Sequence, residues 1–388
     1  MIKSPPPTDS PFESCLFEQL ERWKSRRPLL ITTRQALRPR VQALLSSFPA
    51  ATEPLHIPFS VPYPTYEEVE KPLRKALRFA PDGIVAIGGG TVLDLAKVLR
   101  AGLASGGDLE IFSNLPAPTT FKWLPMVAIP TTAGSGSEAT PFAVLYRGTT
   151  KTSLQHPGLL PDRVLLDSSL LADLPRSIRM SAGLDALAQA IESCWSVCAT
   201  EESRALAHES IRIARDHLLS AVEGQQTSLK AMQQAAFLSG QAIATSRTTL
   251  AHALSYGLTT EYGTSHGLAV FLMLPRVVRF NQQLDTSNCQ DPDGPEAVQA
   301  RIAEIERLLG GPSPSPLDQQ LERFLSHFNI SPDLKDHGVR DNQSRERIVT
   351  GALRSGRTNT NPREARAEPL IECLAEPPTT HPTRQALR

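Results

Sequence analysis

The stretch Gly83-Ile84-Val85-Ala86-Ile87-Gly88-Gly89-Gly90-Thr91 places a short apolar run directly before three consecutive glycines. Apolar residues recur at helical spacing beyond Thr91, which predicts a strand, a glycine turn and a helix in that order. This order is typical of the βαβ unit of a nucleotide-binding sheet. The glycines allow backbone N–H groups to approach a pyrophosphate at the helix N-terminus. The G-x-G-x-x-G fingerprint itself is absent, because Leu93 occupies its last glycine position.

A second loop of the same kind follows the apolar run Met126 to Ile129. Residues Pro130 to Glu138 offer several hydroxyl groups and two glycines at the end of a predicted strand, where open α/β sheets bind their ligands. A flexible surface loop is the alternative, and cofactor binding is the favoured interpretation. Further strands are predicted at Pro28–Thr33, Leu55–Phe59, Phe142–Tyr146 and Arg163–Asp167. We therefore expect an α/β dinucleotide-binding domain over residues 1–174.

Helical spacing dominates from Ser181 onward, where glycine and proline become less frequent. Long amphipathic patterns cover residues 199–222 and 229–242, and others cover 298–309 and 317–328. These patterns predict an all-helical domain over residues 175–388. Beyond about residue 364 the chain is rich in Pro, Thr and Arg, so we expect a poorly ordered tail.

A candidate metal site lies in the second half of the chain. The stretch Gly183–Glu192 favours a helix, on which Asp185 and Gln189 stand one turn apart on the same face. Both side-chain oxygens can then point to one spot, where a divalent cation would bind with imidazoles from elsewhere. His252 and His266 are the candidates. The alternative is that Asp185 complements the helix dipole and that the histidines are ordinary polar core residues.

The two histidines can share a metal only if the chain reverses between them. An unbroken helix of fourteen residues would separate the imidazoles by about 21 Å. Gly257 and Gly263 lie between the histidines, and we expect both glycines to interrupt the helix.

The composition excludes several other classes of function. The chain of 388 residues carries 40 basic and 40 acidic side chains, so neither a nucleic acid nor a membrane is an expected partner. No apolar run reaches the roughly 20 residues needed to cross a bilayer, and the N-terminus lacks the apolar segment of a signal peptide. The five cysteines are scattered rather than arranged as a disulfide framework. A cytoplasmic location follows as the default expectation.

Four motifs in sequence order resemble those of a known family. They are Ile87–Thr91 with Asp94–Lys97, Ile129–Glu138, Gly183–Ala186 with Ala190–Glu192, and Ser265–Gly267. With these motifs the chain resembles the iron-containing (metal-dependent) alcohol dehydrogenases over nearly its whole length. The resemblance implies the architecture that this family shares with the dehydroquinate synthases: a dinucleotide domain, then an all-helical metal domain, with the active site between them.

The resemblance also implies roles for individual residues. The residues implied to bind the NAD(P)H cofactor are Thr33, Gly88, Gly89, Gly90, Thr91, Asp94, Thr131, Thr132, Ser135, Ser137 and Lys151. Asp185, His252 and His266 fall on the family's positions for ligands of a divalent metal, Fe or Zn. Gln189 stands where most members have a further histidine ligand. Its neutral oxygen suits a hard cation but binds more weakly than imidazole.

Within the family, the sequence is most similar to a branch that includes phosphonoacetaldehyde reductases. The similarity lies in Ala190–Val197, Thr200–Ser203 and Ser246–Tyr256, and glutamine at the position of Gln189 is usual in that branch. The resemblance implies reduction of phosphonoacetaldehyde to 2-hydroxyethylphosphonate in phosphonate biosynthesis. The predicted substrate residues are Arg247, Thr248, Thr249 and Tyr256. A guanidinium and hydroxyls at a helix start suit a phosphonate, although helix capping with a solvated Arg247 is the alternative.

Cofactor preference and reaction class leave alternatives open. After the first strand Thr33 is followed by Arg34, where NAD-preferring members have an acid. This tolerates a 2′-phosphate, so NADPH and NADH are both considered. The other hypotheses are a generic short-chain alcohol dehydrogenase, a lyase on the same scaffold and a non-catalytic nucleotide-binding protein. One hypothesis for the oligomeric state is a homodimer.

Overall fold

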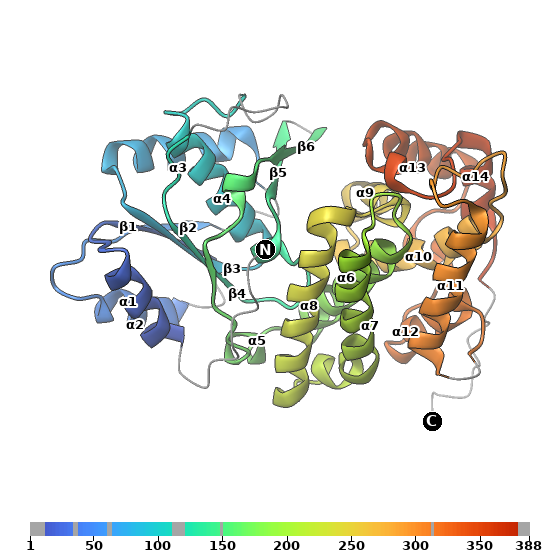
Figure 1. The fold of residues 1–388 in the computed structure, drawn as a ribbon, viewed down its shortest axis with the longest axis horizontal. Coiled ribbons are helices and arrows are strands. Elements are labelled where there is room, and N and C mark those ends of the chain that lie inside the picture. Colours follow the sequence, from blue (N-terminus) through green and yellow to red (C-terminus); the bar gives the residue numbers. More distant parts are fainter. Residues whose placement is uncertain are drawn as a thin grey trace. The chain divides into compact units, whose positions relative to one another are not determined.

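The computed structural model describes residues 12–33, 38–59, 64–110, 121–147, 150–311 and 314–378 (Figure 1). The chain forms two compact units. The first comprises Met1–Arg179 with Gly224–Gly240, and the second comprises Met180–Glu223 with Gln241–Arg388. The domain boundary at residue 174 stays a prediction.

A five-stranded parallel sheet forms the centre of the first unit. Its strands are β1 (Pro28–Thr33), β2 (Leu55–Phe59), β3 (Gly83–Gly88), β4 (Met126–Pro130) and β7 (Arg163–Val164), in the order β2-β1-β3-β4-β7. Every residue of β3 and β4 is buried, as expected for parallel strands covered on both faces. The chain passes from β1 to β2 on one side and returns to β3 on the other. The carboxyl ends of β1 and β3 therefore flank the switch point at which such sheets bind ligands.

Helices cover this sheet and supply its core. They are α1 (Phe12–Arg22), α2 (Arg38–Ser47), α3 (Tyr66–Phe79), α4 (Gly90–Ala104) and the short α5 (Ser169–Ala172). Thr65 and Glu68 form a capping box that begins α3. Apolar residues of α3 and α4 pack with those of the strands in one cluster. The predicted α/β class is therefore confirmed.

A separate antiparallel hairpin joins β5 (Phe142–Arg147) to β6 (Thr150–Gln155). The strand predicted at Arg163–Asp167 is shorter than expected, because only Arg163 and Val164 pair with β4. Strand β6 was not predicted from the sequence.

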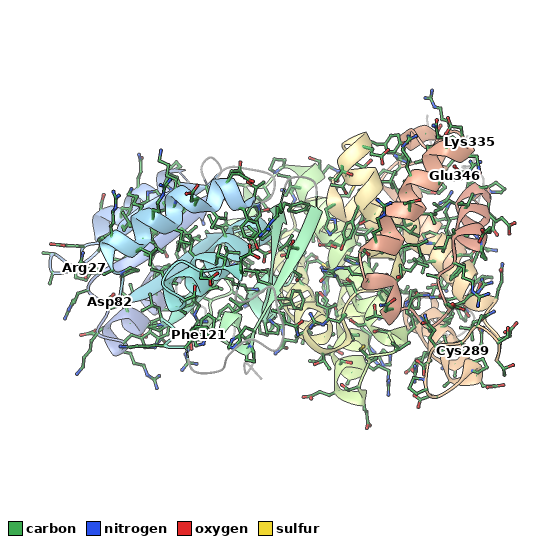
Figure 2. All side chains as sticks on the ribbon, turned by 90° about the horizontal axis from the view of Figure 1, so that it is seen from above. Arg27, Asp82, Phe121, Cys289, Lys335 and Glu346 are labelled. Atoms are coloured by element: carbon green, nitrogen blue, oxygen red, sulfur yellow. The ribbon has the colours of Figure 1, made fainter. Side chains whose placement is uncertain are left out.

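The exposed carboxylate of Asp82 ties the amino ends of two strands together. The Asp82 carboxylate accepts hydrogen bonds from the backbone N–H of Arg26 at 2.7 Å and of Arg27 at 3.0 Å. It also accepts one from the Ser25 hydroxyl. Figure 2 shows Arg27 and Asp82 near one another in this region. These bonds join the turn before β1 to the turn before β3, at the opposite end of the sheet from the glycine loop.

The second unit is helical, as predicted. Its helices are α7 (Glu201–Val222), α9 (Leu250–Tyr262), α10 (His266–Gln282), α11 (Pro295–Gly310), α12 (Leu317–His327), α13 (Asn342–Arg354) and α14 (Ala367–Ala375). Two further helices, α6 (Arg176–Trp195) and α8 (Gln226–Ser246), contribute residues to both units. Every residue of α6 from Gly183 to Trp195 is buried. A helix that is buried on all sides belongs to a core, so its polar side chains need partners. Among the described helices, none is long and apolar enough to span a membrane.

The expected disorder beyond residue 364 is wrong for the segment up to residue 378. Helix α14 occupies this segment and buries Leu370, Cys373 and Leu374. The Cys373 thiol contacts the carbonyl oxygen of Arg276 in α10 at 3.1 Å. The polar composition concealed a short apolar face, and this face packs on the helical core. Residues 379–388 lie outside the described part of the chain.

Candidate metal centre

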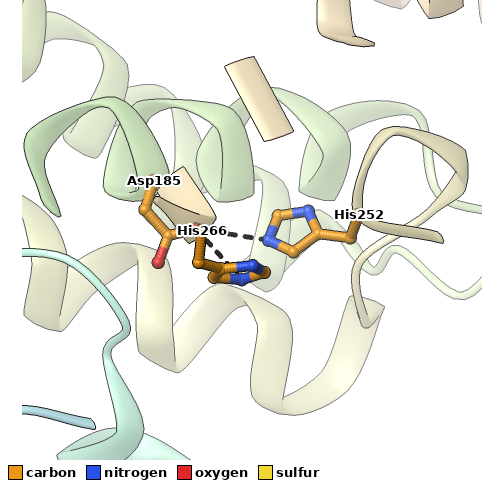
Figure 3. A group of neighbouring side chains, drawn as sticks. All are labelled: Asp185, His252 and His266. Atoms are coloured by element: carbon orange, nitrogen blue, oxygen red, sulfur yellow. Dashed lines mark ion pairs between the residues drawn. The ribbon is translucent and has the colours of Figure 1, made fainter. Parts of the chain in front are cut away.

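Three predicted ligands meet at one point of the helical unit. Asp185 of α6, His252 of α9 and His266 of α10 each offer one ligand atom, and these atoms lie within 4.8 Å of one another (Figure 3). Asp185 Oδ1 lies 3.4 Å from His252 Nε2 and 3.9 Å from His266 Nε2. One carboxylate and two imidazoles are ligands that Fe and Zn accept in proteins. The donor set therefore fits a divalent transition metal.

The chain reverses between the two histidines as expected, but at only one of the two glycines. Gly263 ends α9 in the left-handed conformation with φ of +69°, and its N–H donates to the carbonyl oxygen of Leu258. The prediction that Gly257 interrupts the helix is wrong, because this residue lies inside α9. A Cβ on Gly257 would lie 2.7 Å from Cγ1 of Ile348, so this glycine allows α9 and α13 to pack closely.

Gly267 determines how closely the first turn of α10 approaches α6. A Cβ at this position would lie 1.9 Å from the carbonyl oxygen of Ser181 and 2.8 Å from Cβ of Asp185. Only a residue without a side chain fits there. The glycine next to His266 is therefore required for the approach of His266 to Asp185.

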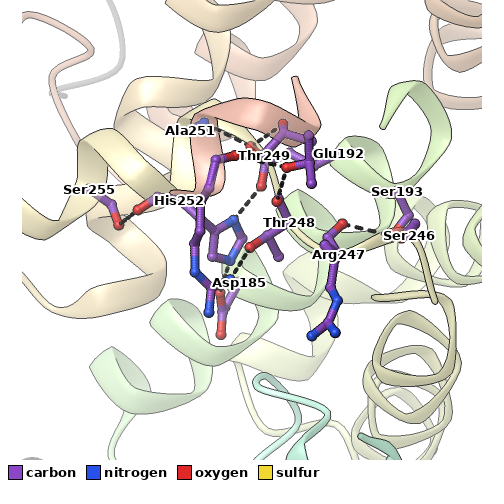
Figure 4. A network of polar contacts seen from close by, with 12 residues as sticks. Asp185, Glu192, Ser193, Ser246, Arg247, Thr248, Thr249, Ala251, His252 and Ser255 are labelled. Carbon is purple, nitrogen blue, oxygen red and sulfur yellow. Dashed lines mark hydrogen bonds and ion pairs between the residues drawn. The ribbon is translucent and has the colours of Figure 1, made fainter. Parts of the chain in front are cut away.

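Glu192 orients one of the two imidazoles. Its side chain is fully buried, and its Oε2 pairs with Nδ1 of His252. Its Oε1 accepts from the Thr249 hydroxyl and from the Ala251 N–H, each at 2.7 Å (Figure 4). Since a carboxylate accepts, Nδ1 of His252 carries the hydrogen and Nε2 faces Asp185. This is the arrangement that a metal-binding histidine needs.

The pKa values of this pair describe the metal-free site. Burial alone would lower the pKa of His252, but Glu192 and Asp185 outweigh burial and raise it to about 9. Burial likewise would raise the pKa of Glu192, but the charge of His252 and hydrogen bonds from His252 and Thr249 bring it below 4.5. Without metal the imidazole is therefore protonated at neutral pH. A cation would replace the proton on Nε2, and its binding would release that proton.

Glu192 was not among the predicted site residues, although the sequence carries a signal for it. Asp185, Gln189 and Glu192 are spaced at i, i+4 and i+7, which places them on one face of α6. Three polar side chains on one face of a buried helix indicate a shared task. Gln189 is 4 % exposed, and its role as a metal ligand stays a prediction.

The glycine loop and the hydroxyl-rich loop pack directly on each other. Gly88 and Pro130 are partners in the β3–β4 register, and Thr131 N–H donates to the carbonyl oxygen of Gly88 at 3.0 Å. A Cβ on Gly89 would lie 3.2 Å from Cγ2 of Thr132. A Cβ on Gly90 would lie 2.6 Å from the Ser135 hydroxyl oxygen. The consecutive glycines therefore allow the two loops to touch at the carboxyl ends of β3 and β4.

Two predicted cofactor residues hold this loop in place. The Ser137 hydroxyl donates to Asp94 Oδ1 at 2.6 Å, and the Val144 N–H donates to Asp94 Oδ2 at 3.0 Å. The buried ammonium of Lys97 donates to the hydroxyls of Ser137 at 3.0 Å and Thr140 at 2.9 Å. Burial lowers the pKa of Lys97 to about 8. Lys97 was not among the predicted site residues, yet it and Asp94 fix the shape of the loop.

Three other predicted cofactor residues, Thr33, Thr91 and Lys151, lie on three separate elements of the first unit. Thr33 ends β1 beside Phe59, and Thr91 lies in the first turn of α4. Lys151 lies on β6 opposite Tyr146, and its side chain is outside the described part of the structure, as is Arg34.

Three of the four predicted substrate residues, Arg247, Thr248 and Thr249, form the short segment that leads into α9. Arg247 is half-buried and has φ of +65°, which is rare for a residue with a side chain. Thr249 begins α9 without a capping bond from its side chain, so helix capping does not explain this residue. Its hydroxyl donates to Glu192 and accepts from Trp195 Nε1 at 3.1 Å. Thr249 therefore positions Glu192, and Tyr256 lies one turn after His252 in α9.

Comparison with protein families agrees with this geometry. Residues 13–168 match the model described as iron-containing alcohol dehydrogenase, and residues 179–376 match that of the C-terminal part of the Fe-containing alcohol dehydrogenase family. The chain belongs to the iron-containing alcohol dehydrogenase family. It is an oxidoreductase that acts on CH–OH groups with NAD(P) and a metal, so the lyase and the non-catalytic protein are set aside.

Three relatives illustrate this membership. The phosphonoacetaldehyde reductase of Streptomyces viridochromogenes is 34 % identical over 326 residues, which cover 81 % of this chain and 80 % of that protein. The long-chain-alcohol dehydrogenase 1 of Geobacillus thermodenitrificans is 32 % identical over 295 residues, covering 72 % and 70 %. The solved iron-containing alcohol dehydrogenase of Thermococcus thioreducens matches with a TM-score of 0.82 and 25 % identity, covering 94 % of this chain and 95 % of that one.

Proposed function

We propose that the protein reduces phosphonoacetaldehyde to 2-hydroxyethylphosphonate in phosphonate biosynthesis, with NADPH or NADH as reductant. The observation that carries this proposal is the position of Arg247 in the segment that runs directly into the helix of His252. A guanidinium is the side chain best suited to a phosphonate. The similarity to a phosphonoacetaldehyde reductase over four fifths of both chains supports the same substrate.

The proposed metal ligands are Asp185, His252 and His266, with Gln189 as the fourth donor. A bound Fe or Zn ion would act as a Lewis acid toward the carbonyl oxygen and would stabilise the alkoxide. Glu192 keeps His252 in the tautomer that ligation requires. Because Gln189 is neutral, as an imidazole ligand would be, Asp185 remains the one negative charge among the four donors. The positive charge of the site, which favours the alkoxide, is thereby retained.

The proposed cofactor site lies at the carboxyl ends of β1, β3 and β4. There the first turn of α4 and the loop after Pro130 offer N–H groups and hydroxyls for a pyrophosphate. A reduced nicotinamide bound there would supply a hydride to the aldehyde carbon, and water would supply the proton that the product oxygen gains. Asp94 and Lys97 keep the loop in shape through their bonds to Ser137. With Thr33 at the end of β1 instead of an acid, a 2′-phosphate is tolerated.

The substrate assignment is tested by following NADPH and NADH absorbance with phosphonoacetaldehyde and with propionaldehyde. We expect kcat/KM to be at least about 100-fold higher for the phosphonate, as several charge-assisted hydrogen bonds would provide. The Arg247→Ala variant should raise KM for phosphonoacetaldehyde at least about tenfold and leave that for propionaldehyde within about threefold. Arg212→Ala, at an exposed position of α7, is the matched control. Equal KM changes for both aldehydes in Arg247→Ala would contradict the assignment.

The metal assignment is tested by chelation of the full-length protein, followed by addition of Fe²⁺ or Zn²⁺. Activity should disappear on complete metal removal and return with one of the two ions. Undiminished activity of the metal-free protein would reject ligation by the three side chains.

A further inference from the structure

A segment about 110 residues further along the chain lies against the proposed phosphonate site. The short 3₁₀ helix η5 (Arg357–Thr360) contacts Thr248 through two side chains. The Arg357 guanidinium donates through Nη1 to the Thr248 hydroxyl, and the Thr360 hydroxyl donates to the Thr248 carbonyl oxygen at 2.8 Å. Thr248 is only 3 % exposed. Arg357 is therefore held beside the residue that follows Arg247.

Donor groups remain at this position after the protein contacts are counted. Arg357 is half-buried, and within the described part of the chain its guanidinium makes one hydrogen bond, that to Thr248. A guanidinium has five N–H donors. The Thr248 hydroxyl accepts this bond, and among the described residues no acceptor takes its own proton. Both groups can therefore donate to an added ligand.

Two positively charged side chains, those of Arg247 and Arg357, are half-buried in this part of the structure. Burial, and then the charge of Arg357, lower the pKa of Arg247 below its ordinary value. The charge of Arg357 therefore disfavours that of Arg247. Arg247 also keeps its left-handed backbone, and the buried Ser246 beside it holds the segment through a 2.9 Å bond to the Ser193 hydroxyl (Figure 4). Two like charges close to one another and a strained backbone are features typical of a binding site.

We propose that Arg357 and Arg247 together bind a dianionic head group, and that Arg357 makes the enzyme specific for a phosphonate over monoanionic analogues. The inference rests on the proposed function, because both arginines would serve the same substrate. Two guanidiniums balance the charge of a fully ionised phosphonate, whereas a sulfonate or a carboxylate carries one charge. The forks of two arginines and the Thr248 hydroxyl can each donate to a different oxygen of a tetrahedral head group. Arg357 thus adds a second arginine to the substrate site that the sequence assigned to Arg247, Thr248, Thr249 and Tyr256.

The test uses the full-length, metal-loaded enzyme and three unreactive analogues that share an ethyl group: ethylphosphonate, ethanesulfonate and propionate. Their dissociation constants are measured by calorimetry over the pH range in which the phosphonate takes its second charge. Wild type should bind ethylphosphonate at least about 30-fold more tightly than the monoanions, and its affinity should rise as the second charge forms. Arg357→Ala should weaken ethylphosphonate binding at least about 30-fold and abolish this rise. The KM for propionaldehyde should stay within about threefold.

Two further variants keep the outcome decisive. Arg357→Lys retains one charge and should keep part of the pH-dependent rise, whereas Arg357→Gln should behave like Arg357→Ala. If Arg357→Ala does not fold, these two variants test the role of Arg357 in its place. Arg354→Ala, at an exposed position of α13, should change nothing. A structural role of Arg357 would lower the affinity for all three analogues equally, and this result would overturn the inference.

Failure of this inference and failure of the proposed function look different. If wild type prefers phosphonoacetaldehyde and Arg247→Ala removes the preference but Arg357→Ala does not, then only the role of Arg357 is wrong. If wild type prefers uncharged aldehydes and does not bind ethylphosphonate, then both the substrate and the role of Arg357 are wrong.

Discussion

Replacement of Glu192 by Gln should weaken metal binding without removing any metal ligand. In the wild type, Oε1 of Glu192 accepts from Thr249 and Ala251, and Oε2 accepts from Nδ1 of His252. A glutamine can keep the first two bonds with its carbonyl oxygen. Its amide group would then present hydrogens to Nδ1 of His252. The imidazole must accept there, so its own hydrogen moves to Nε2, the atom that faces Asp185.

The size of the effect follows from this change of tautomer. Substitution of a partner that orients a metal ligand typically lowers metal affinity by about 10- to 100-fold, or about 1.4 to 2.7 kcal/mol. Here both the ring orientation and the tautomer depend on one fully buried carboxylate. We therefore expect the upper end, about 100-fold weaker binding.

The assay is competition for Zn²⁺ between the full-length protein and a chromophoric chelator, for wild type and Glu192→Gln. Glu209→Gln makes the same chemical change at an exposed position of α7 and should retain wild-type affinity. Unfolding of the metal-free proteins by urea shows whether the fold is intact. If intact Glu192→Gln bound Zn²⁺ within threefold of wild type, the orienting role of Glu192 would be refuted.

Three further predictions concern stability and loop geometry. Burial raises the pKa of Glu138 from 4.5 to about 7, so between these pH values the native state holds a proton that the unfolded chain has released. The free energy of unfolding of wild type minus that of Glu138→Gln should therefore fall by roughly 3 kcal/mol as pH rises from 4.5 to 7.5; a flat difference in urea unfolding would contradict this. Gly267→Ala should destabilise the protein by about 1–3 kcal/mol and weaken Zn²⁺ binding, because its Cβ would meet the carbonyl oxygen of Ser181 at 1.9 Å; wild-type Zn²⁺ affinity would count against this packing. Gly136 has φ of +60°, and a Cβ at this position would lie only 2.4 Å from Cα of Gly240. The Gly136→Ala variant should therefore lower the midpoint of urea unfolding by more than Gly106→Ala, because Gly106 has a similar φ of +70° but open space around it. An equal drop in the two variants would refute the contact.

The sequence predicted structure correctly where neighbouring residues form a clear pattern. The apolar run before Gly88 predicted a buried strand, and the spacing of Asp185 and Gln189 predicted one face of a helix; β3 and α6 have these properties. Local patterns were weaker where burial depends on distant partners. Nothing local distinguished Gly257, which packs against Ile348 inside a helix, from Gly263, which ends one. The apolar face of α14 was similarly concealed by its polar neighbours.

The side chains that orient the site were invisible to spacing alone. Lys97 meets Ser137 and Thr140 across about 40 residues, and Glu192 meets His252 across 60. Arg357 meets Thr248 across 109 residues. Periodicity relates residues within a few turns of one helix, so it cannot indicate which distant polar groups share a buried contact.

The sequence by itself determined the α/β class of the first half and the helical class of the second, the glycine turn after β3 and the three candidate metal donors. These features follow from backbone freedom, burial periodicity and ligand chemistry, which are properties of neighbouring residues. Only the tertiary structure decided that Glu192 orients His252, that Gly267 brings His266 to Asp185, and that a second arginine lies beside Thr248. Those relations exist because several helices bury their polar faces together, and a buried polar group takes its partner from whatever the fold places beside it.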